Sequence, residues 1–411
     1  MSGALPAAPR TTRRITLSVA GLVLSRWTSV RVPRNLRDIA GSFMVQYRDA
    51  GREALAFDPD LDPMPRSPTV LSGQACSVAI DGTTVLTGWI DKVEAQWEGQ
   101  QLTCTISGRD KTGDLVDCAA SPNGPVEWRN VNTLQIAQAI CKPFGITARS
   151  DVPIDTQFPV FGVDADETAL SAIEKAARQT ALLVVSDGVG GLLLTRGGNT
   201  RAPAPLQRPG NIQGGGWQSD WSQRFSDYYV KGQTNRSVIR KGSVPAMSIV
   251  TVPQTGESFP VETTASATTT ESVAVTMTGH AIDPEVTRYR PTVRTAKTQS
   301  GAATVQDQAD WGLRVAKGQA ETGHYRVLDW RAGSGNALWL PNALTHLTDP
   351  YAMVDRDMLI SGVTYCYDQG GEYTQIEVAG RTAFDRIDEP ASDPRYIQAK
   401  RPKSFGPTRA G

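Results

Sequence analysis

Hydrophobic and polar residues alternate along much of this 411-residue chain. A period of two is typical of β-strands with one buried face. The run from Ile15 to Leu24 follows it, as does the run from Ser42 to Arg48. Two further runs between residues 74 and 90 flank Asp81-Gly82, a dipeptide that favours a two-residue hairpin turn. The first 110 residues therefore predict about six antiparallel strands, arranged as a barrel or a sandwich.

Helical periodicity appears further along the chain. Asn132 is placed to cap a first helix, which Pro143 ends. We expect Asp166 to cap a second helix, and a third to run from Ala303 to about Glu321. Two apolar runs within 182–196 surround a glycine-rich turn and predict another hairpin.

Two distant segments carry the same landmarks in the same order. Each has a strand with a glycine, a polar gap and a second strand that ends in Gly-Arg: Gly88 with Gly108-Arg109, and Gly362 with Gly380-Arg381. Aligning the Gly-Arg pairs gives an offset of 272 residues (381 − 109), and a two-residue slip in the turn then aligns Gly88 with Gly362. This self-similarity favours a duplicated β-domain, with convergent strand-turn-strand patterns as the alternative. We expect these six residues to be fold determinants, because glycine allows close backbone approach and arginine can anchor a carboxylate or carbonyl.

The predicted fold class is α+β and mainly β, with two similar antiparallel β-barrel domains and smaller α/β domains between them. The expected units are a first β-barrel domain (1–125), a small α+β domain (126–205), a second β-barrel domain (206–240 and 325–395), an inserted mixed region with one helix (241–324) and a polar tail (396–411). Residues 243–280 within the insertion are rich in Ser, Thr, Val and Pro, and predict an exposed β-arm or a mobile loop.

Composition narrows the classes of function. Lys plus Arg equal Asp plus Glu at 42 each, which argues against a protein that coats nucleic acid. The five cysteines have no C-x-x-C spacing and the three histidines are far apart, so we expect no disulfide framework, no metal and no cofactor. No apolar run approaches the roughly 18 residues of a membrane span.

Two clusters invite a chemical interpretation. The glycines at 188, 190 and 191 could be a phosphate loop, but a strand follows them where such a loop needs a helix. Asp164, Asp166 and Glu167 could form an acid-base cluster, although helix capping explains them without chemistry. We therefore assign no catalytic residue.

Several runs resemble the baseplate hub protein family of phage Mu and related tailed phages. The most distinctive is Gly108 to Cys118. The others are Trp27 to Val32, Ile39 to Phe43, Ile140 to Ile146, Leu193 to Arg196, Tyr229 to Gln233 and Leu359 to Val363. They follow the family order over nearly the whole chain, whereas the Thr/Ser-rich stretch near 253–278 looks like an addition.

The resemblance implies a non-enzymatic structural protein of the virion tail, assembled in the host bacterial cytoplasm. It implies a homotrimer with two barrels in each chain, so that six equivalent units surround a central channel. The implied partners are the tail tube or a distal tail protein, the central spike protein, other baseplate proteins, and the tape measure protein and DNA that pass through the channel.

Two other functions remain as alternatives. A peptidoglycan-hydrolysing protein would need two carboxylates in one cleft, which a sequence cannot place. A glycan-binding protein could use Trp217, Trp221, Trp330 and Trp339 as stacking platforms, although tryptophans in strands are more often core or interface residues.

Overall fold

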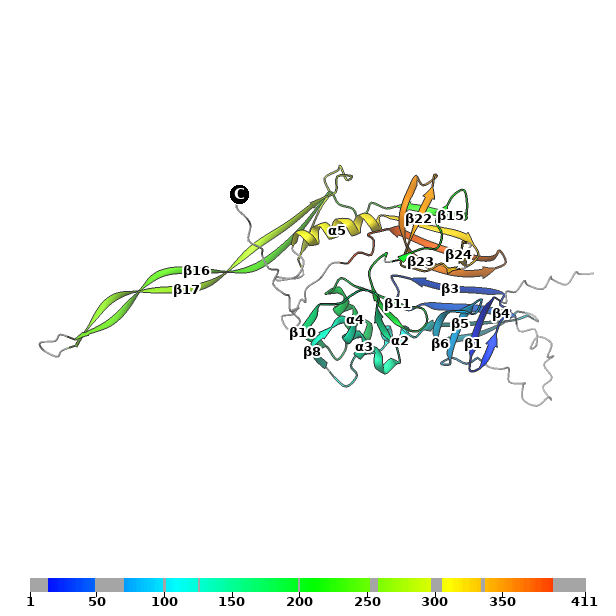
Figure 1. Ribbon diagram of the computed structural model, residues 1–411, viewed down its shortest axis with the longest axis horizontal. Coiled ribbons are helices and arrows are strands. Elements are labelled where there is room, and N and C mark those ends of the chain that lie inside the picture. The colour runs from blue at the N-terminus through cyan, green and yellow to red at the C-terminus, as the bar shows by residue number, and fades with distance from the viewer. Residues whose placement is uncertain are drawn as a thin grey trace, which may run out of the picture.

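The computed structural model describes residues 14–48, 70–98, 101–124, 126–198, 200–251, 258–296, 305–333 and 337–386, with the side chains of 101 and 233–276 left out of account. Most of these residues lie in antiparallel strands, which confirms the predicted mainly-β α+β class. The largest sheet combines strands from the N-terminal and C-terminal parts of the chain. The helices lie in a domain that comes between these parts in the sequence, and beside a long hairpin (Figure 1).

The N-terminal strands form the first β-unit. They are β1 (Ile15–Val19), β2 (Leu22–Leu24), β3 (Ser29–Asn35), β4 (Ser42–Arg48), β5 (Ala75–Ile80), β6 (Thr83–Glu98) and β7 (Gln101–Asp110). The predicted hairpin between β5 and β6 is present, and both Asp81 and Gly82 have positive φ as its turn requires. Ile15 to Leu24, which the alternation predicts as one strand, folds back at Ala20-Gly21 into β1 and β2.

The middle domain combines three helices with short strands. Its elements are α2 (Gly113–Asp117), β8 (Val126–Asn132), α3 (Thr133–Cys141), a 3-10 turn (Lys142–Phe144), β9 (Ala148–Ser150), β10 (Gln157–Val163), α4 (Ala169–Arg178), β11 (Leu183–Ser186) and β12 (Leu192–Thr195). Asn132 caps α3 through a reciprocal capping box with Gln135, as predicted. The predicted cap of the next helix was wrong: Thr168 accepts the hydrogen bond from the Ser171 amide, because the helix begins two residues later than expected.

The second β-unit comes from the C-terminal part of the chain. Its strands are β13 (Thr200–Arg201), β14 (Leu206–Gln207), β15 (Ile212–Ser219), β19 (Glu321–Leu328), β22 (Ala343–Asp349), β23 (Val354–Asp368) and β24 (Gly371–Gly380), with β20 (Arg331–Ala332) and β21 (Ala337–Leu338) as a separate small hairpin.

A long antiparallel hairpin is inserted between β15 and β19 of this second unit. It consists of β16 (Asp227–Thr251) and β17 (Ser258–Ile282). Strand β18 (Pro291–Thr295) pairs with β16 at the base of the hairpin, and helix α5 (Val305–Gln319) follows in the chain. Figure 1 shows the hairpin extending well beyond the body of the protein. Residues 227–240, which the sequence assigns to the second barrel, therefore pair with β17 instead of the large sheet. At the hairpin base, the guanidinium of Arg224 is buried against the Asp283 carboxylate.

The two β-units repeat one strand order. The order in the first unit is β3-β4-β7-β6-β5, and in the second it is β15-β19-β24-β23-β22, with the same chain order and antiparallel contacts throughout. Each of the ten residue pairs that join β6 to β7 becomes a pair of β23 and β24 when 270 is added to both numbers (371 − 101). The bulge at Asp91 falls on the bulge at Ser361 under the same offset. The two units are thus copies of one sheet.

The offset read from the sequence was wrong by two residues in the second strand and by four in the first. Gly108 is equivalent to Val378, and Gly88 to Met358, so the conspicuous glycines of the two units do not correspond. A shift by two residues keeps every side chain on its face of the sheet, and the hydrophobic pattern cannot detect it.

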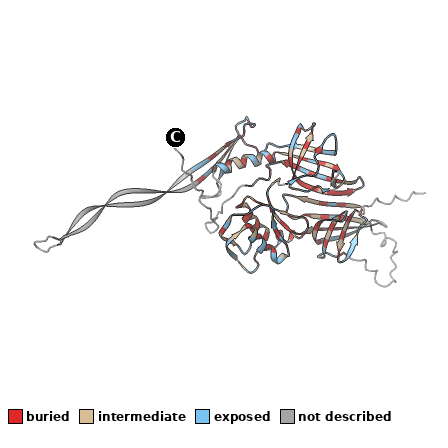
Figure 2. Cartoon of the chain, in the orientation of Figure 1, coloured by how far each residue is buried: buried red, intermediate tan, exposed pale blue. Residues whose placement is uncertain are grey.

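A single hydrophobic core serves both β-units. Ile15, Val78 and Ile106 of the first unit belong to the same buried cluster as Val327, Ile360 and Ile376 of the second. Figure 2 shows buried residues along the strands of both units. The middle domain has its own core around α3 and α4. Asp110, at the end of β7, connects the first unit with the middle domain by accepting hydrogen bonds from the Gly41 amide (3.1 Å) and the Ser186 hydroxyl (2.6 Å).

Candidate functional site

The two β-units are joined by direct strand pairing. The second half of β23, from Gly362 to Tyr367, forms an antiparallel ladder with β3, from Asn35 back to Val30. The first half of β23 pairs with β22, and the bulge at Ser361 separates the halves. Val363, Tyr365 and Tyr367 point from this ladder into the shared core, and each is at most 6% exposed. The chain thus contains one complete unit-to-unit junction.

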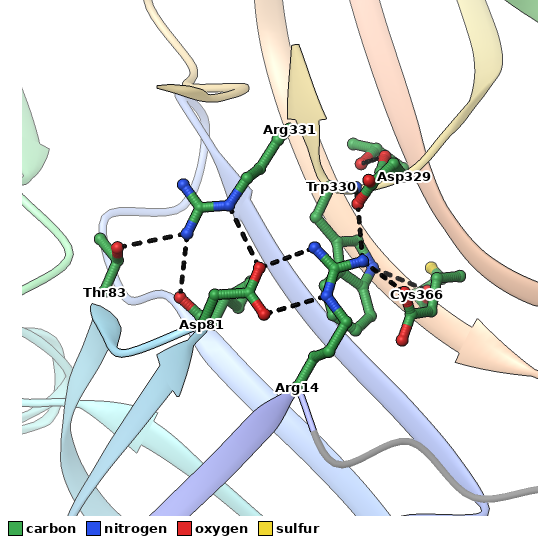
Figure 3. Close-up of polar contacts among 10 residues, drawn as sticks. Arg14, Asp81, Thr83, Asp329, Trp330, Arg331 and Cys366 are labelled. Carbon is green, nitrogen blue, oxygen red and sulfur yellow. Dashed lines mark hydrogen bonds and ion pairs between the residues drawn. The ribbon is translucent and has the colours of Figure 1, made fainter. Parts of the chain in front are cut away.

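An ion cluster covers one side of this junction (Figure 3). Arg14, just before β1, donates two hydrogen bonds to Asp81 in the turn between β5 and β6, at 2.6 and 2.9 Å. The same guanidinium reaches Asp329 at 3.0 Å and Glu372 at 2.5 Å in the second unit. Arg331 approaches the Asp81 carboxylate from the second unit at 3.2 Å. Two arginines and three carboxylates therefore cross the boundary between the units.

Electrostatics and burial both fix this cluster. The hydrogen bonds from Arg14, and then those from Arg331, hold the pKa of Asp81 below its usual value, so the carboxylate stays ionised at neutral pH. Beneath the cluster, Trp330 is fully buried and its indole donates to the Cys366 carbonyl at 2.9 Å. The Arg14 guanidinium lies 4.9 Å from the centre of that indole ring. This arrangement holds two sheets in one orientation.

Two strand edges of the same geometry stay open. The second half of β6, from Lys92 to Glu98, pairs with β7 on one side, and no described strand pairs with it on the other. Strand β15 pairs with β19 alone within the described part of the chain. Under the repeat, these edges are the equivalents of β23 and β3, which meet inside the chain. Trp97 on the β6 edge is 78% exposed.

The six landmark residues lie in varied surroundings. A Cβ atom on Gly88 would lie 1.9 Å from the Arg109 carbonyl oxygen, and one on Gly108 would lie 2.0 Å from that of Trp89. A Cβ on Gly380 would lie 2.7 Å from the Cα of Gly318 in α5, and one on Gly362 would touch the Glu377 carboxylate at 3.0 Å. These glycines stand where another chain segment approaches closely.

The two landmark arginines differ. Arg109 donates to Asp91 at 3.1 Å and to Asp117 at 2.7 Å, and its presence lowers the pKa of Asp117. Arg381 is exposed in the turn after β24. The roles of all six landmarks as fold determinants stay predictions.

The other candidates take structural places. Glycines 188, 190 and 191 lie in the turn between β11 and β12, as the hairpin interpretation expects. Glu167 pairs with Lys175 at 2.6 Å, while Asp164 and Asp166 are exposed. Trp330 and Trp339 are buried, and Trp221 lies 4.2 Å beneath the Arg224 guanidinium. Among the described residues no group of His, Cys, Asp and Glu could hold a metal ion, and no described helix is long and apolar enough to cross a membrane.

The residues that join the two units were not predicted from the sequence. The sequence indicated Asp81 only as a turn residue. Arg14 is separated from Glu372 by 358 positions, so no local spacing relates them. The single signal that could have identified the junction is the repeat itself.

Comparison with known proteins matches most of the chain. Residues 14–110 match the family described as Mu phage baseplate assembly protein GpP-like, N-terminal; residues 112–196 match Baseplate hub protein gp44-like, second domain; and residues 301–387 match Mu phage baseplate assembly protein GpP, fourth domain. The chain is 30% identical to Baseplate hub protein gp44 of Escherichia phage Mu over 90% of this chain and 88% of that protein.

Solved structures agree with this relationship. The 43 kDa tail protein of prophage MuSo2 from Shewanella oneidensis shares 26% identity, with a TM-score of 0.71 over 91% of this chain and 99% of the other. A tail protein from Neisseria meningitidis MC58 has the same fold, with 18% identity and a TM-score of 0.66 over 91% and 99%. The duplicated sheet, the matching domains and the shared sequence place this chain in the family of phage Mu baseplate hub proteins.

Proposed function

We propose that three copies of this chain form a ring of six similar β-units that joins a sixfold tail tube, or a distal tail protein, to a threefold central spike. The matched strand order and register of the two units support this proposal most directly. Three chains with two equivalent units each present six nearly identical surfaces on one face and three distinct ones on another. A hub of this kind fits both neighbours without unmatched binding surfaces.

The junction inside the chain supports a rigid, permanent assembly. Its strand pairing, shared core and ion cluster combine features of obligate interfaces, which commonly bury more than about 2,000 Å². The open edges of β6 and β15 support further pairing, because unpaired strand edges are otherwise sites of aggregation. Ring closure would surround a channel through which the tape measure protein and DNA pass, and other baseplate proteins would bind outside.

The proposed role involves no bond making or breaking. Its support is positive: the conspicuous charged clusters have structural partners, and the relationship is to proteins named as baseplate hubs and tail proteins. Assembly would take place in the host bacterial cytoplasm, and the mature location would be the tail baseplate.

Mass photometry of the purified chain at micromolar concentration tests the ring. We expect a species of three times the 44.2 kDa chain mass, and six-lobed rings in negative-stain averages. A protein that stays monomeric, or that forms a ring with another number of chains, would overturn the proposal. A clearing band in peptidoglycan zymography would contradict the non-catalytic role.

A further inference from the structure

The two open strand edges have the geometry of a junction that the chain already contains. We propose that β15 of one copy pairs in antiparallel fashion with the second half of β6 in a second copy. This inference rests on the proposed ring and names the contact that closes it. Each copy would then contact one neighbouring chain through β15 and the other neighbouring chain through β6. Such a head-to-tail interface can close into a ring.

The repeat fixes the register of this pairing. The offset of 270 carries Lys92–Trp97 of β6 onto Gly362–Tyr367 of β23. The ladder of β3 with β4 is equivalent to the ladder of β15 with β19. Each residue of β3 therefore corresponds to the residue of β15 whose number is 185 higher (214 − 29). Since Gly362 pairs with Asn35 and Tyr367 with Val30, Lys92 should lie opposite Asp220 of the second copy, and Trp97 opposite Gly215.

The side chains at these positions are complementary. Lys92 and Asp220 carry opposite charges, and both are exposed in the single chain. Lys92 there contacts Glu94 at 2.5 Å, an exposed pair that is weak enough to rearrange on association. Trp97 would cross over Gly215, where the absence of a side chain leaves room for an indole. The register thus brings together one charge pair and one large-small pair.

A cavity beside β15 supports the same arrangement. It has a volume of about 650 Å³, and glycines 214 to 216 form part of its wall together with Tyr325 and Asp349. At the junction inside the chain, the residue equivalent to Trp97 is Tyr367, which is buried in the shared core. We infer that this cavity receives Trp97 of the second copy.

Two further exposed apolar side chains border the cavity. Tyr351 is 85% exposed and Met353 is 91% exposed, and both lie between β22 and β23. Their turn is the equivalent of the Asp81-Gly82 turn, which is covered by Arg14 and Arg331 in the first unit. The β6–β7 hairpin of the second copy would cover them, which explains why large apolar groups are exposed there in the single chain.

Disulfide trapping tests the register. Directly opposite residues of an antiparallel pair have Cα atoms about 4.5–5.5 Å apart, within disulfide range. In a Cys118→Ser background, Val93→Cys with Ser219→Cys should give covalent dimers and trimers on a non-reducing gel. Ala95→Cys with Ser219→Cys keeps the same face but shifts the register by two residues, and should give at least tenfold less product.

The outcomes separate the contact from the ring. Trimers in mass photometry without cross-linked product at the 93–219 pair would overturn the register and leave the ring intact. Stronger cross-linking at the shifted pair would also overturn the register. Monomers at micromolar concentration, before any cysteine is introduced, would overturn the ring itself.

Charge exchange gives a second test. Lys92→Asp or Asp220→Lys alone should raise the concentration at which trimers dissociate at least tenfold, and the two together should restore it. Trp97→Ser should weaken association at least as strongly, whereas Tyr289→Ser, at an exposed tyrosine outside both edge strands, should not. If the double charge variant dissociates as readily as the single ones, the proposed pairing of Lys92 with Asp220 is wrong.

Discussion

The β6–β7 and β23–β24 hairpins have the same ladder and the same bulge, yet they lie in different surroundings. Beyond its bulge, β23 is covered by β3, and Tyr367 is buried. Beyond its bulge, β6 pairs with no described strand on its outer side, and the equivalent Trp97 is exposed. In a duplicated sheet, one copy of a strand edge can therefore pair within the chain while the equivalent edge remains available for contacts with another chain.

The interiors of the two copies also exchange large and small residues. In the first unit, Phe43 of β4 lies opposite Gly108 of β7. At the equivalent place in the second unit, Gly323 of β19 lies opposite Val378 of β24. The side-chain bulk has moved from one strand to the other while the ladder is preserved. At this place both units keep one larger apolar side chain opposite a glycine, although on different strands.

The largest contrast is expected at the equivalent positions 367 and 97. Tyr367→Ala should lower the free energy of unfolding by about 3–5 kcal/mol, because it leaves a cavity in the shared core. Trp97→Ala should change it by no more than about 0.5 kcal/mol, since its ring is in solvent. Urea unfolding, at a concentration where light scattering finds monomer, measures both. Equal losses would show that the two edges are not in different surroundings.

A second contrast concerns the close approach of strands at Gly108. Gly108→Ala should destabilise the chain by about 3 kcal/mol, because the new Cβ would overlap the Trp89 carbonyl oxygen. Gly312→Ala in α5 is the matched control. A Cβ there meets nothing closer than Tyr228 at 3.8 Å, so this change should be neutral or should stabilise by about 0.5–1 kcal/mol. Thermal unfolding of both variants provides the comparison.

The ion cluster should distinguish the closed junction from an ordinary surface. Asp81→Ala should cost about 2 kcal/mol, because it leaves Arg14 and Arg331 without their shared acceptor. Asp117→Ala, which removes an exposed partner of Arg109, should cost no more than about 0.5 kcal/mol. Guanidinium unfolding at neutral pH measures the difference, and similar costs at both sites would contradict a special role for the junction.

The same cluster predicts a dependence on pH. The folded pKa of Asp81 lies below its unfolded value, so its contribution is present above about pH 4 and is lost as pH falls through the folded pKa. The stability difference between the wild type and Asp81→Ala should therefore shrink on acidification below about pH 4. A difference that stays constant down to pH 2 would show that folding does not lower the pKa of Asp81.

The smallest effect is expected at the two landmark arginines. Arg109→Ala removes a contact with Asp91, the bulge residue at the start of the open edge, and should lower trimer yield with a loss of about 0.5 kcal/mol in folding. We expect Arg381→Ala to lower trimer yield as well, and by less, because its side chain is exposed in a turn. Size-exclusion chromatography at fixed protein concentration measures the yield, and unchanged trimer in both variants would remove assembly as their role.

Local chemistry made much of the fold predictable. The Asp81-Gly82 turn, the cap at Asn132 and the hairpin around glycine 190 follow from residues within a few positions of one another. Thr168 shows the limit of such reasoning, since Asp166 and Thr168 are both residue types that cap helices and the sequence favoured the wrong one. The long hairpin was one of two possibilities that its composition left open.

The sequence by itself favoured a duplicated sheet without giving its register, and it determined that β-strands dominate and where three helices and several turns lie. Each of these depends on periodicity or on short-range contacts. Only the tertiary structure decided the register of the copies, because strand patterns repeat every two residues and cannot detect a slip of two. It alone decided that β3 pairs with β23 and that Arg14 meets Glu372, because such contacts depend on how distant segments pack together.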